Sequence, residues 1–509
     1  MYYTQAIKMD KSNIDAYINL SQCYRQKQEY NNSYSVIKKA SEIAPENQLV
    51  KKQLEAVSNE YSTNIYNAAT NAYESGNYEN ALRSEIYVDK SNLLAYTNSL
   101  INTSDRYICV SRPRRFGKTI TANMLCSYYE KDTNADLIFH NLSFSLNESF
   151  KAHANKYDVF MIDMNRFVDE EVDIHQFIHQ IDKNIRRDLI REYPDVIYYE
   201  DDELNIFLEH FYNSTKRKFI FIIDEWDAFF REQKYNKSGQ SFYLSFLKKL
   251  FKDRSYIGLV YMTGILPIKK YGKHSALNMF RECSMTDPRG LAEYIGFTED
   301  EVMNLCHKFN MDFDECKKWY DGYFFENVRS IYNPRSVVDS MVFHKYDTYW
   351  SKTESYEALS LYIDLNIDGL YDEIVALLSN EMRKIDVDGY LNDMTTFITK
   401  DDVLTLLIHL GYIGYNSSTN DIFIPNNEIY IEFAKSLKSE KWREIRECIN
   451  RSRKLLEDTL AMKEDFVAKG IEEAHFNTDI FTYNDENALS YTVSLAYYFA
   501  REYYIIKRE

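Results

Sequence analysis

The sequence predicts an α/β protein built on a doubly wound, mostly parallel sheet, with α-helical repeats before it and a helical, partly winged-helix region after it. Glycine (14) and proline (7) are scarce in the 509 residues, which leaves too few turn residues for an all-β chain. Short apolar runs alternate with helical patterns in the middle of the chain, as expected for a parallel sheet. Near the N-terminus, small and large residues recur at a spacing of about 34 residues, which indicates helical repeats.

Residues 1–83 fit a series of helix–turn–helix repeats. A tetratricopeptide frame placed on 13–45 puts residues of the expected size at its marked positions: Tyr17, Leu20, Ser21, Tyr24, Ser33, Ile37, Ala40 and Pro45. Small residues let the two helices cross closely, and the proline ends the second helix. A second frame, with one residue deleted, covers 66–82, and 1–11 fit the last helix of a preceding repeat. We expect this module to bind a protein partner; an ordinary helical hairpin is the alternative.

A strand, a loop and a helix follow one another at 107–128, the context that a phosphate-binding loop requires. The apolar run 107–110 leads into Ser111-Arg-Pro-Arg-Arg-Phe-Gly-Lys-Thr119. Gly117 lets the backbone approach a phosphate, and the following amides open a helix N-terminus that favours anions. Lys118, which we expect to face solvent, can reach the β and γ phosphates of ATP, and the hydroxyl of Thr119 can ligate Mg²⁺.

This loop departs from the pattern Gly-x-x-x-x-Gly-Lys-[Ser/Thr], because Arg112 stands where the pattern has its first glycine. The match of the loop alone is therefore weak. A nucleotide site also needs a second half, an acidic residue at the end of a neighbouring strand, which would hold the metal. We assign nucleotide binding to the loop and the first turn of the helix: Arg114, Arg115, Phe116, Gly117, Lys118, Thr119 and Ile120.

The second half lies at 218–227, where an apolar strand runs into Asp224-Glu-Trp-Asp227. Side chains at the carboxyl end of a parallel strand face the crevice in which ligands bind. Asp224 is expected to hold the metal and Glu225 to polarise the attacking water, although Asp224 could instead cap the next helix. Thr263, at the tip of a further strand over 256–262, is a candidate sensor of the γ-phosphate. Asp163, after a strand over 159–162, fits a turn residue better than a catalyst.

Several separated motifs resemble the bacterial AAA-ATPase-like family. They are the loop 111–119, the Ile-Ile-Asp-Glu-Trp-Asp box at 222–227, Trp-Tyr-Asp-Gly-Tyr at 319–323, Tyr-Asn-Pro at 332–334 and Ser-Glu-Ile-Tyr-Val-Asp-Lys at 84–90. The resemblance implies an α/β P-loop NTPase core over 84–345 with ATP as its ligand. It also implies that Arg112 belongs to the family's own form of the loop, and it supplies no cellular role.

Residues 346–470 are expected to form a helical domain that includes a winged helix. A helix at 399–411 is followed by hairpin strands at 412–416 and 421–425 and by a second helix at 428–437. In related ATPases such a unit serves as a lid. The basic stretch from Lys435 to Lys454 makes contact with nucleic acid the alternative, although a solvated amphipathic face explains the same charges.

Residues 471–509 resemble the opening of the PD-(D/E)XK-type nuclease domain that often follows this ATPase. The matching segments are a helix at 484–498 and a strand at 503–506. Such a nuclease needs an Asp and a Glu-x-Lys on the next strand to hold a divalent metal. Neither follows, and Glu486 alone has nothing to ligate with, so we expect a truncated stub without nuclease activity.

Composition limits the function classes. The 61 basic and 78 acidic residues give a net charge of −17, which argues against a surface that coats nucleic acid or an anionic membrane. Seven scattered cysteines without C-x-x-C spacing indicate neither zinc nor a disulfide framework. We see no signal peptide and no apolar run near the ~20 residues that span a bilayer, so a cytoplasmic location is expected.

The sequence thus predicts a Mg²⁺-dependent ATPase with Glu225, Lys118 and Thr263 as catalytic residues and with Thr119 and Asp224 as metal ligands. One alternative is a non-hydrolysing nucleotide switch or scaffold. Another is a fragment of an ATPase–nuclease whose nuclease site is missing. An oligomer would allow an arginine finger, for which the candidates are Arg281, Arg289 and Arg335.

Overall fold

The computed structural model describes residues 2–26, 30–54, 57, 78–166, 173–268, 277–325, 328–350, 359, 362–365, 367–378, 381–391, 394–436, 454–456 and 458–476. The chain forms two compact units, Met1–Ser84 and Glu85–Glu509. Most of the second repeat frame (66–82), most of the basic stretch after Lys435 and all of 477–509 lie outside the described residues. The second repeat and the nuclease-like stub, with Glu486, therefore stay predictions.

The first unit is helical. Its helices are α1 (Tyr2–Met9), α2 (Ile14–Gln26) and α3 (Tyr30–Ile43), and a further helical segment covers 48–54. Tyr17, Ile37 and Ala40 are buried where α2 packs on α3. The hydroxyls of Ser21 and Ser33 lie 2.9 Å apart, and each donates to the other residue's carbonyl. Small residues thus stand where the two helices meet, as the repeat frame requires, but an ordinary hairpin would show the same contact.

The second unit is built on a parallel sheet of five strands: β1 (Tyr107–Ser111), β2 (Asp158–Asp163), β3 (Phe219–Asp224), β4 (Ile257–Gly264) and β5 (Arg281–Cys283). Their order is β2-β3-β4-β1-β5, so β4 lies between the strand before the phosphate loop and the strand before Asp224. The sequence predicted four of these strands and missed β5. All carboxyl ends lie at one edge, where Asp224 pairs with Asp163 and Thr263 pairs with Val110.

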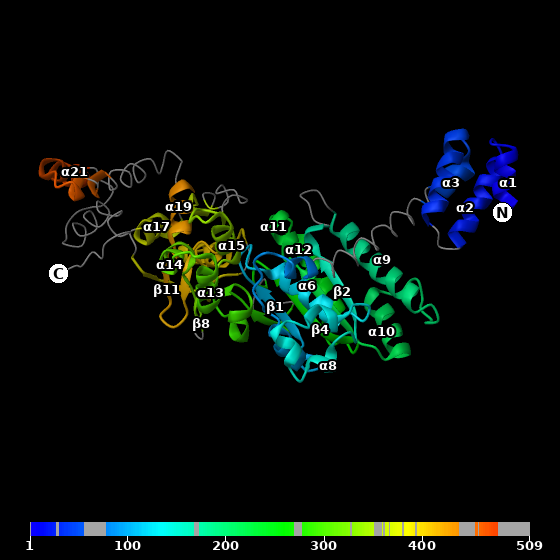
Figure 1. The fold of residues 1–509 in the computed structure, drawn as a ribbon, viewed down its shortest axis with the longest axis horizontal. Helices are drawn as coiled ribbons and strands as arrows, with labels where there is room; N and C mark the ends of the chain where they lie inside the picture. Colours follow the sequence, from blue (N-terminus) through cyan, green and yellow to red (C-terminus); the bar gives the residue numbers. More distant parts are fainter. Residues whose placement is uncertain are drawn as a thin grey trace. The chain divides into compact units, whose positions relative to one another are not determined.

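Helices cover both faces of this sheet (Figure 1). The helices between and around the strands are α5 (Leu93–Leu100), α6 (Lys118–Tyr129), α7 (Ala135–Phe139), α8 (Phe150–His153), α9 (Ile174–Glu192), α10 (Leu204–Thr215), α11 (Ala228–Glu232) and α12 (Lys237–Phe251). Successive strand residues point to opposite faces. Tyr261 meets Thr121 of α6 on one face, and Phe221 meets Phe251 of α12, at 5.3 Å between ring centroids, on the other. The core is therefore doubly wound, as predicted.

The segment that leads into this core is fixed by two charged residues of the 84–90 motif. Asp89 accepts hydrogen bonds from the amide and hydroxyl of Ser143 at 2.7 and 2.5 Å. Lys90 donates to the carboxylate of Glu301 at 2.6 Å and to the carbonyl of Glu293 at 2.7 Å. Both side chains thus join regions that lie far apart in the sequence.

Two smaller antiparallel sheets follow. The first has the order β6 (Phe297–Thr298), β8 (Val328–Tyr332), β7 (Tyr323–Phe325), and the second has the order β10 (Gly414–Asn416), β11 (Asp421–Phe423), β9 (Arg383–Lys384). Their helices are α13 (Glu299–Phe309), α14 (Phe313–Tyr320), α15 (Pro334–Phe343), α17 (Leu370–Leu378), α18 (Lys400–Leu410), α19 (Asn427–Ser436) and α21 (Glu464–Phe476). The predicted helix, hairpin and helix correspond to α18, β10–β11 and α19, whereas β9 was not predicted. Whether they make a winged helix stays a prediction.

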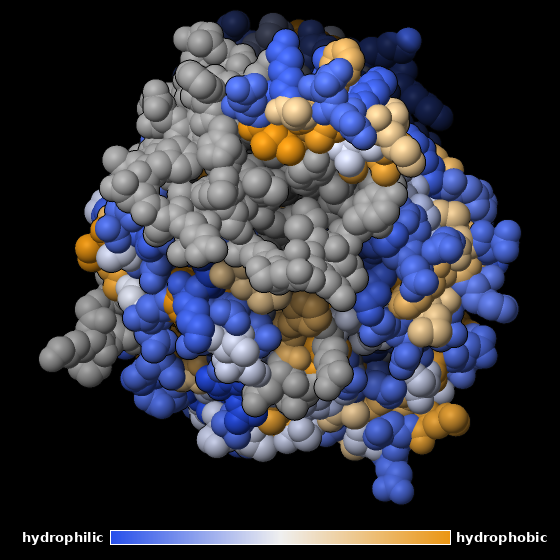
Figure 2. Space-filling model, turned by 90° about the vertical axis from the view of Figure 1, so that its left-hand side faces the viewer, coloured by the Kyte–Doolittle hydropathy of each residue, from blue (hydrophilic) through white to orange (hydrophobic). Residues whose placement is uncertain are grey.

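Hydrophilic residues predominate among the described residues on the face drawn in Figure 2. Within the described part of the chain, no helix combines the length and the apolar character that a bilayer crossing requires. Six cysteines lie in that part, and each is a free thiol: Cys23, Cys109, Cys126, Cys283, Cys306 and Cys316.

Candidate functional site

The phosphate loop joins the end of β1 to the start of α6. Gly117 precedes α6 with a φ of +89°, a left-handed conformation that favours glycine. A Cβ added to Gly117 would meet no atom within 4 Å, so the space beside the backbone is open there. An anion can therefore approach the N-terminus of α6, where unpaired amides and the helix dipole attract it.

Arg112 occupies the position of the missing glycine, and its side chain leaves the loop. The side chain is fully buried and its Nη1 donates to the carbonyls of Ser111, Cys283 and Ser284 at 2.9, 3.2 and 3.0 Å. The guanidinium also lies 4.9 Å from the ring centroid of Phe325. Burial lowers the pKa of Arg112 to about 10. Arg112 therefore ties β1 to the end of β5, a task that glycine could not perform.

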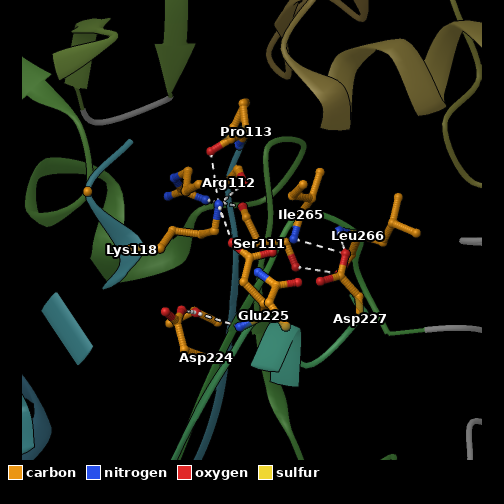
Figure 3. A network of polar contacts seen from close by, with 12 residues as sticks. Ser111, Arg112, Pro113, Lys118, Asp224, Glu225, Asp227, Ile265 and Leu266 are labelled. Carbon is orange, nitrogen blue, oxygen red and sulfur yellow. Dashed lines mark hydrogen bonds and ion pairs between the residues drawn. The ribbon is translucent and has the colours of Figure 1, made fainter. Parts of the chain in front are cut away.

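Lys118 is buried, so the expectation that it faces solvent is wrong. Its Nζ donates to the carbonyls of Arg112 and Pro113, both at 3.1 Å, and lies 3.5 Å from Oε1 of Glu225 (Figure 3). The physical reason is that a buried ammonium must be hydrogen-bonded and paired, and the curved loop offers both. Lys118 thus lies across the loop, directly between the loop carbonyls and the carboxylate that follows β3.

Asp224 ends β3 and is almost fully buried. The hydroxyl of Thr263 on β4 donates to its Oδ1, and the hydroxyl of Thr119 is a second hydrogen-bond partner. Burial and the neighbouring charge of Glu225 raise the pKa of Asp224, although both hydrogen bonds and Lys118 oppose the rise. The structure therefore brings Thr119, Asp224 and Thr263 together from three separate segments, as their places in the sequence predict.

Glu225 follows with a φ of +54°, which is unusual for a residue with a side chain. Its Oε2 accepts from Nη2 of Arg231 at 2.6 Å, and its amide donates to the hydroxyl of Thr263 at 3.4 Å. Burial disfavours the charged form, but the positive charges of Lys118, Arg231 and Arg114 outweigh it and lower the pKa of Glu225. Both carboxylate oxygens of Glu225 are thus paired with cations.

Arg231 was not predicted from the sequence. It lies on α11, is nearly buried, and connects Glu225 with Asp227, whose Oδ2 lies 3.3 Å from its Nε. The signal that could have found it is the four-residue spacing of Asp227 and Arg231, which places the two side chains on one helix face.

Asp227 has a structural role. Its Oδ2 accepts hydrogen bonds from the amides of Ile265 and Leu266 at 3.1 and 2.8 Å (Figure 3). Burial raises the pKa of Asp227, although Arg231 opposes the rise. Asp227 therefore fixes the turn that follows β4, just after Thr263.

The remaining residues assigned to nucleotide binding differ in how far their side chains are exposed and in what they contact. Arg114 is exposed and close enough to Glu225 to lower its pKa, whereas Ile120 is exposed on α6. Arg115 donates to the carbonyl of Tyr349 at 3.4 Å, and Phe116 is buried. Arg115 and Phe116 therefore use their side chains to contact later parts of the chain, at Tyr349 and Tyr323.

The donor set fits a magnesium nucleotide. The hydroxyl of Thr119 and the carboxylate of Asp224 are hard oxygen ligands, which suit Mg²⁺ when phosphate oxygens and water complete its coordination. Among the described residues, no group of three His, Cys, Asp or Glu side chains could hold a metal by itself. A metal at this site would therefore depend on the nucleotide for its other ligands.

The other residues considered from the sequence, Asp163 and the three candidate arginine fingers, form hydrogen bonds or ion pairs with other side chains of this chain. Asp163 accepts from the amide of Asn165 at 3.1 Å and from Arg166, which fits a turn residue. Each arginine-finger candidate pairs with a carboxylate: Arg281 with Asp105, Arg289 with Asp287 and Arg335 with Asp339.

A parallel sheet with a phosphate loop after β1 and an Asp-Glu pair after β3 is the arrangement found in P-loop nucleotide-binding proteins of the α/β class. Residues 72–272 match a family model described as "Predicted AAA-ATPase", so this part of the chain is similar to that family. This match supports the resemblance to the AAA-ATPase-like family that the sequence motifs indicated. The nuclease-like segment and the N-terminal repeats stay predictions.

Among curated proteins, no match to the chain was found. Among solved structures, the chain is similar to one described as the Aeropyrum pernix ORC2 protein in ADPNP–ADP complexes. The identity is 10%, the alignment covers 69% of this chain and 95% of that chain, and the TM-score is 0.27. A TM-score this low carries no argument about the function of this chain.

Proposed function

We propose that the chain binds Mg²⁺–ATP at the phosphate loop and hydrolyses it. The observation that carries this proposal is the convergence of Thr119, Asp224 and Thr263, with Lys118 and Glu225 beside them, at the carboxyl ends of adjacent strands. The open space beside Gly117, at the N-terminus of α6, supports phosphate binding at the same place.

Each side chain has a separate task in this mechanism. Thr119 and Asp224 would hold Mg²⁺, which neutralises the charge that develops on the phosphate oxygens. Lys118 would exchange the loop carbonyls for the phosphates, since an ammonium binds a charged oxygen more strongly than a neutral one. Glu225, ionised because of its neighbours, would orient the attacking water. Thr263 keeps Asp224 and the amide of Glu225 in register.

The second candidate function is a nucleotide switch that binds ATP without turnover. One observation favours it: both oxygens of Glu225 are engaged, by Lys118 at 3.5 Å and by Arg231 at 2.6 Å. These two ion pairs lower the basicity of Glu225 and restrict the directions from which water can approach its oxygens.

Counting turnovers separates the two functions. The purified chain is incubated with excess ATP, and phosphate release per chain is followed with Mg²⁺ and then with a chelator. Hydrolysis predicts many turnovers that stop on chelation and are lost in Asp224→Asn. A switch predicts tight, Mg²⁺-dependent binding with at most one turnover. Absence of both binding and turnover would refute both functions.

The flanking regions supply further proposals. We propose that residues 1–83 bind a protein partner, as helical repeats commonly do; the Ser21–Ser33 contact is compatible with such a repeat and equally with an ordinary helical hairpin. For the segment from α18 to α19 we propose the role of a lid, and contact with nucleic acid is the alternative. A finger supplied by a second copy would require one of the three candidate arginines to leave its present carboxylate.

A further inference from the structure

The Trp-Tyr-Asp-Gly-Tyr motif at 319–323 takes no part in the chemistry above, yet its last residue touches the phosphate loop. The motif runs from the end of α14 into the first residue of β7. Tyr323 is buried, and its ring meets that of Phe116 edge to face, at 5.3 Å between centroids and 79° between planes. Such aromatic pairs add specific stabilisation to the burial of their surface. Tyr323 of the motif therefore packs against Phe116 of the phosphate loop.

The hydroxyl of Tyr323 makes a second connection. It donates to the carbonyl of Gly411 at 2.7 Å. Gly411 ends α18 with a φ of +88°, and a Cβ added to it would lie 2.8 Å from Cβ and Cγ of Pro113. Gly411 thus packs directly on the loop, and the hydrogen bond from Tyr323 fixes its position. Tyr323 contacts the loop through Phe116 and, by way of Gly411, through Pro113.

The motif is also fastened to the antiparallel hairpin. Gly322 has a φ of +116°, and a Cβ there would lie 2.2 Å from the carbonyl oxygen of Pro425. The amide of the Asn426 side chain donates to the carbonyl of Asp321 at 2.7 Å. A Cβ on Gly414 of β10 would lie 2.8 Å from the carbonyl of Gly322. The segment therefore connects the hairpin region with the loop without room for adjustment.

Pro113 contacts both Lys118 of the nucleotide site and Gly411 of the α18–hairpin segment. Its carbonyl accepts the hydrogen bond from Lys118 at 3.1 Å, and its ring packs on Gly411. If Lys118 exchanges that carbonyl for a phosphate, the peptide of Pro113 loses a partner on one side while Gly411 restrains it on the other. The geometry of the loop is therefore set in part by residues far beyond the nucleotide-binding core.

We propose that Tyr323 is a positioning residue for the phosphate loop, so that the α18–hairpin segment sets the affinity for ATP. This inference rests on the proposed nucleotide binding at that loop. Coupling between two sites is reciprocal, so bound nucleotide stabilises residues 400–425 by the same factor. The segment thereby reports the nucleotide state through Tyr323 and Gly411.

The test compares two nearly isosteric variants. Tyr323→Phe keeps the ring against Phe116 and removes only the hydroxyl. Tyr320→Phe, in the same motif, removes a hydroxyl that donates to the carbonyl of Asp347 at 2.9 Å and has no described contact with the loop. The dissociation constant of Mg²⁺–ATP and the KM of hydrolysis are measured for both, together with thermal unfolding. Tyr323→Phe is expected to weaken ATP binding and raise KM by about three- to tenfold, the effect of one buried hydrogen bond.

A purely structural role would not produce this pattern. The kcat of Tyr323→Phe should stay near that of the unmodified chain, because no group at the reacting atoms changes, and Tyr320→Phe should leave KM unchanged. Hydrogen exchange at 411–416 should slow on ATP binding, and less so in Tyr323→Phe. Gly411→Ala, which adds a Cβ against Pro113, should raise KM further; if it fails to fold, Tyr323→Phe still decides.

The outcomes distinguish the two proposals. An unmodified chain that binds no nucleotide refutes the proposed function, and the positioning role with it. Normal binding in Tyr323→Phe, or an equal loss in Tyr320→Phe, refutes the positioning role alone.

Discussion

Glu225 shares its two carboxylate oxygens between two cations, and this sharing determines how the residue can act. Lys118 would leave it for a phosphate, whereas Arg231 stays anchored by Asp227. After that exchange Glu225 would keep one oxygen in an ion pair and have the other free. A residue held on one side and free on the other is suited to orient water, because its position is fixed while one acceptor remains.

Replacing Glu225 with glutamine tests this role. The change is nearly isosteric, so Mg²⁺–ATP should bind with an affinity close to normal. Turnover should fall by about 10²–10⁴-fold, the range typical for loss of a general base. The measurements are an equilibrium titration and steady-state phosphate release. Loss of ATP binding as well would mean that the pairing with Arg231 is structural and that Glu225 is not the base.

Replacing Lys118 with alanine tests the loop. The fold should persist, because Arg231 still neutralises Glu225. ATP binding should weaken by about ten- to hundredfold, as expected for the loss of hydrogen bonds from a charged donor, and hydrolysis should stop. The matched control is Lys218→Ala, a lysine just before β3, at the opposite edge of the sheet from the site. Unchanged hydrolysis in Lys118→Ala would rule out the phosphate-loop assignment.

The residues of the site were largely predictable, but their partners were not. Their residue types, together with their positions at the end of an apolar strand or the start of a helix, predict five of them: Lys118, Thr119, Asp224, Glu225 and Thr263. The burial of Lys118 and the bridge made by Arg231 depend on how loops close after folding. The spacing of a single segment does not contain that information.

At the scale of elements, long apolar strands were predictable and short ones were not. The strand over 219–224 is a continuous apolar run, whereas β5 consists of Arg281, Glu282 and Cys283. This sequence has no strand signature, and Arg112 helps to fix its end by hydrogen bonds to the carbonyls of Cys283 and Ser284. Tertiary contacts therefore decide the shortest strands, as they decide the two-residue strand β9.

Helix α19 carries a buried carboxylate whose ionisation should affect stability. Glu428 accepts hydrogen bonds from the amides of Tyr349 and Trp350 at 2.5 and 2.8 Å. Burial nevertheless raises its pKa from 4.5 to about 7. A raised pKa means that the folded chain binds more protons than the unfolded chain between these values. Stability from this group is therefore present below about pH 4.5 and is lost as the pH rises through 7.

The variant Glu428→Gln should remove this pH dependence. It keeps an oxygen that can accept from both amides but carries no charge. Its free energy of unfolding should exceed that of the unmodified chain by up to about 3 kcal/mol at pH 8, and the difference should vanish near pH 4.5. Urea unfolding at several pH values measures it, with the exposed Glu148→Gln as a control. A variant less stable than the parent at pH 8 would show that the charge itself strengthens the two hydrogen bonds.

At the scale of the whole molecule, the acidic chain concentrates buried cations at one place. Its net charge is −17, yet Arg112, Lys118 and Arg231 are all buried around the phosphate loop. Lys118 and Arg231 are paired with carboxylates, whereas Arg112 is held by backbone carbonyls and the ring of Phe325. Asp224, Glu225 and Asp227 lie beside these cations and balance their charge, so a bound phosphate would have to compete with the carboxylates for Lys118.

The division of the chain into two units supports a last prediction. Every residue assigned to the site or to its positioning lies within Glu85–Glu509, and none of them is among the described residues of Met1–Ser84. A variant that lacks residues 1–71, which precede the family match and the 84–90 motif, should therefore bind and hydrolyse ATP within about twofold of the full chain, because changes at independent sites add. Steady-state kinetics and ATP titration of both forms measure this, with Lys118→Ala in each as the inactive reference.

A point variant in the full-length chain separates deletion of the unit from damage to it. Ser21→Leu places a large side chain where Ser21 and Ser33 now lie 2.9 Å apart, and overpacking such a contact typically costs 1–3 kcal/mol. This variant should lower the stability of the first unit while KM and kcat stay unchanged. If the deletion or Ser21→Leu alters KM by tenfold, the N-terminal helices take part in nucleotide binding. Their role would then extend beyond the capture of a protein partner.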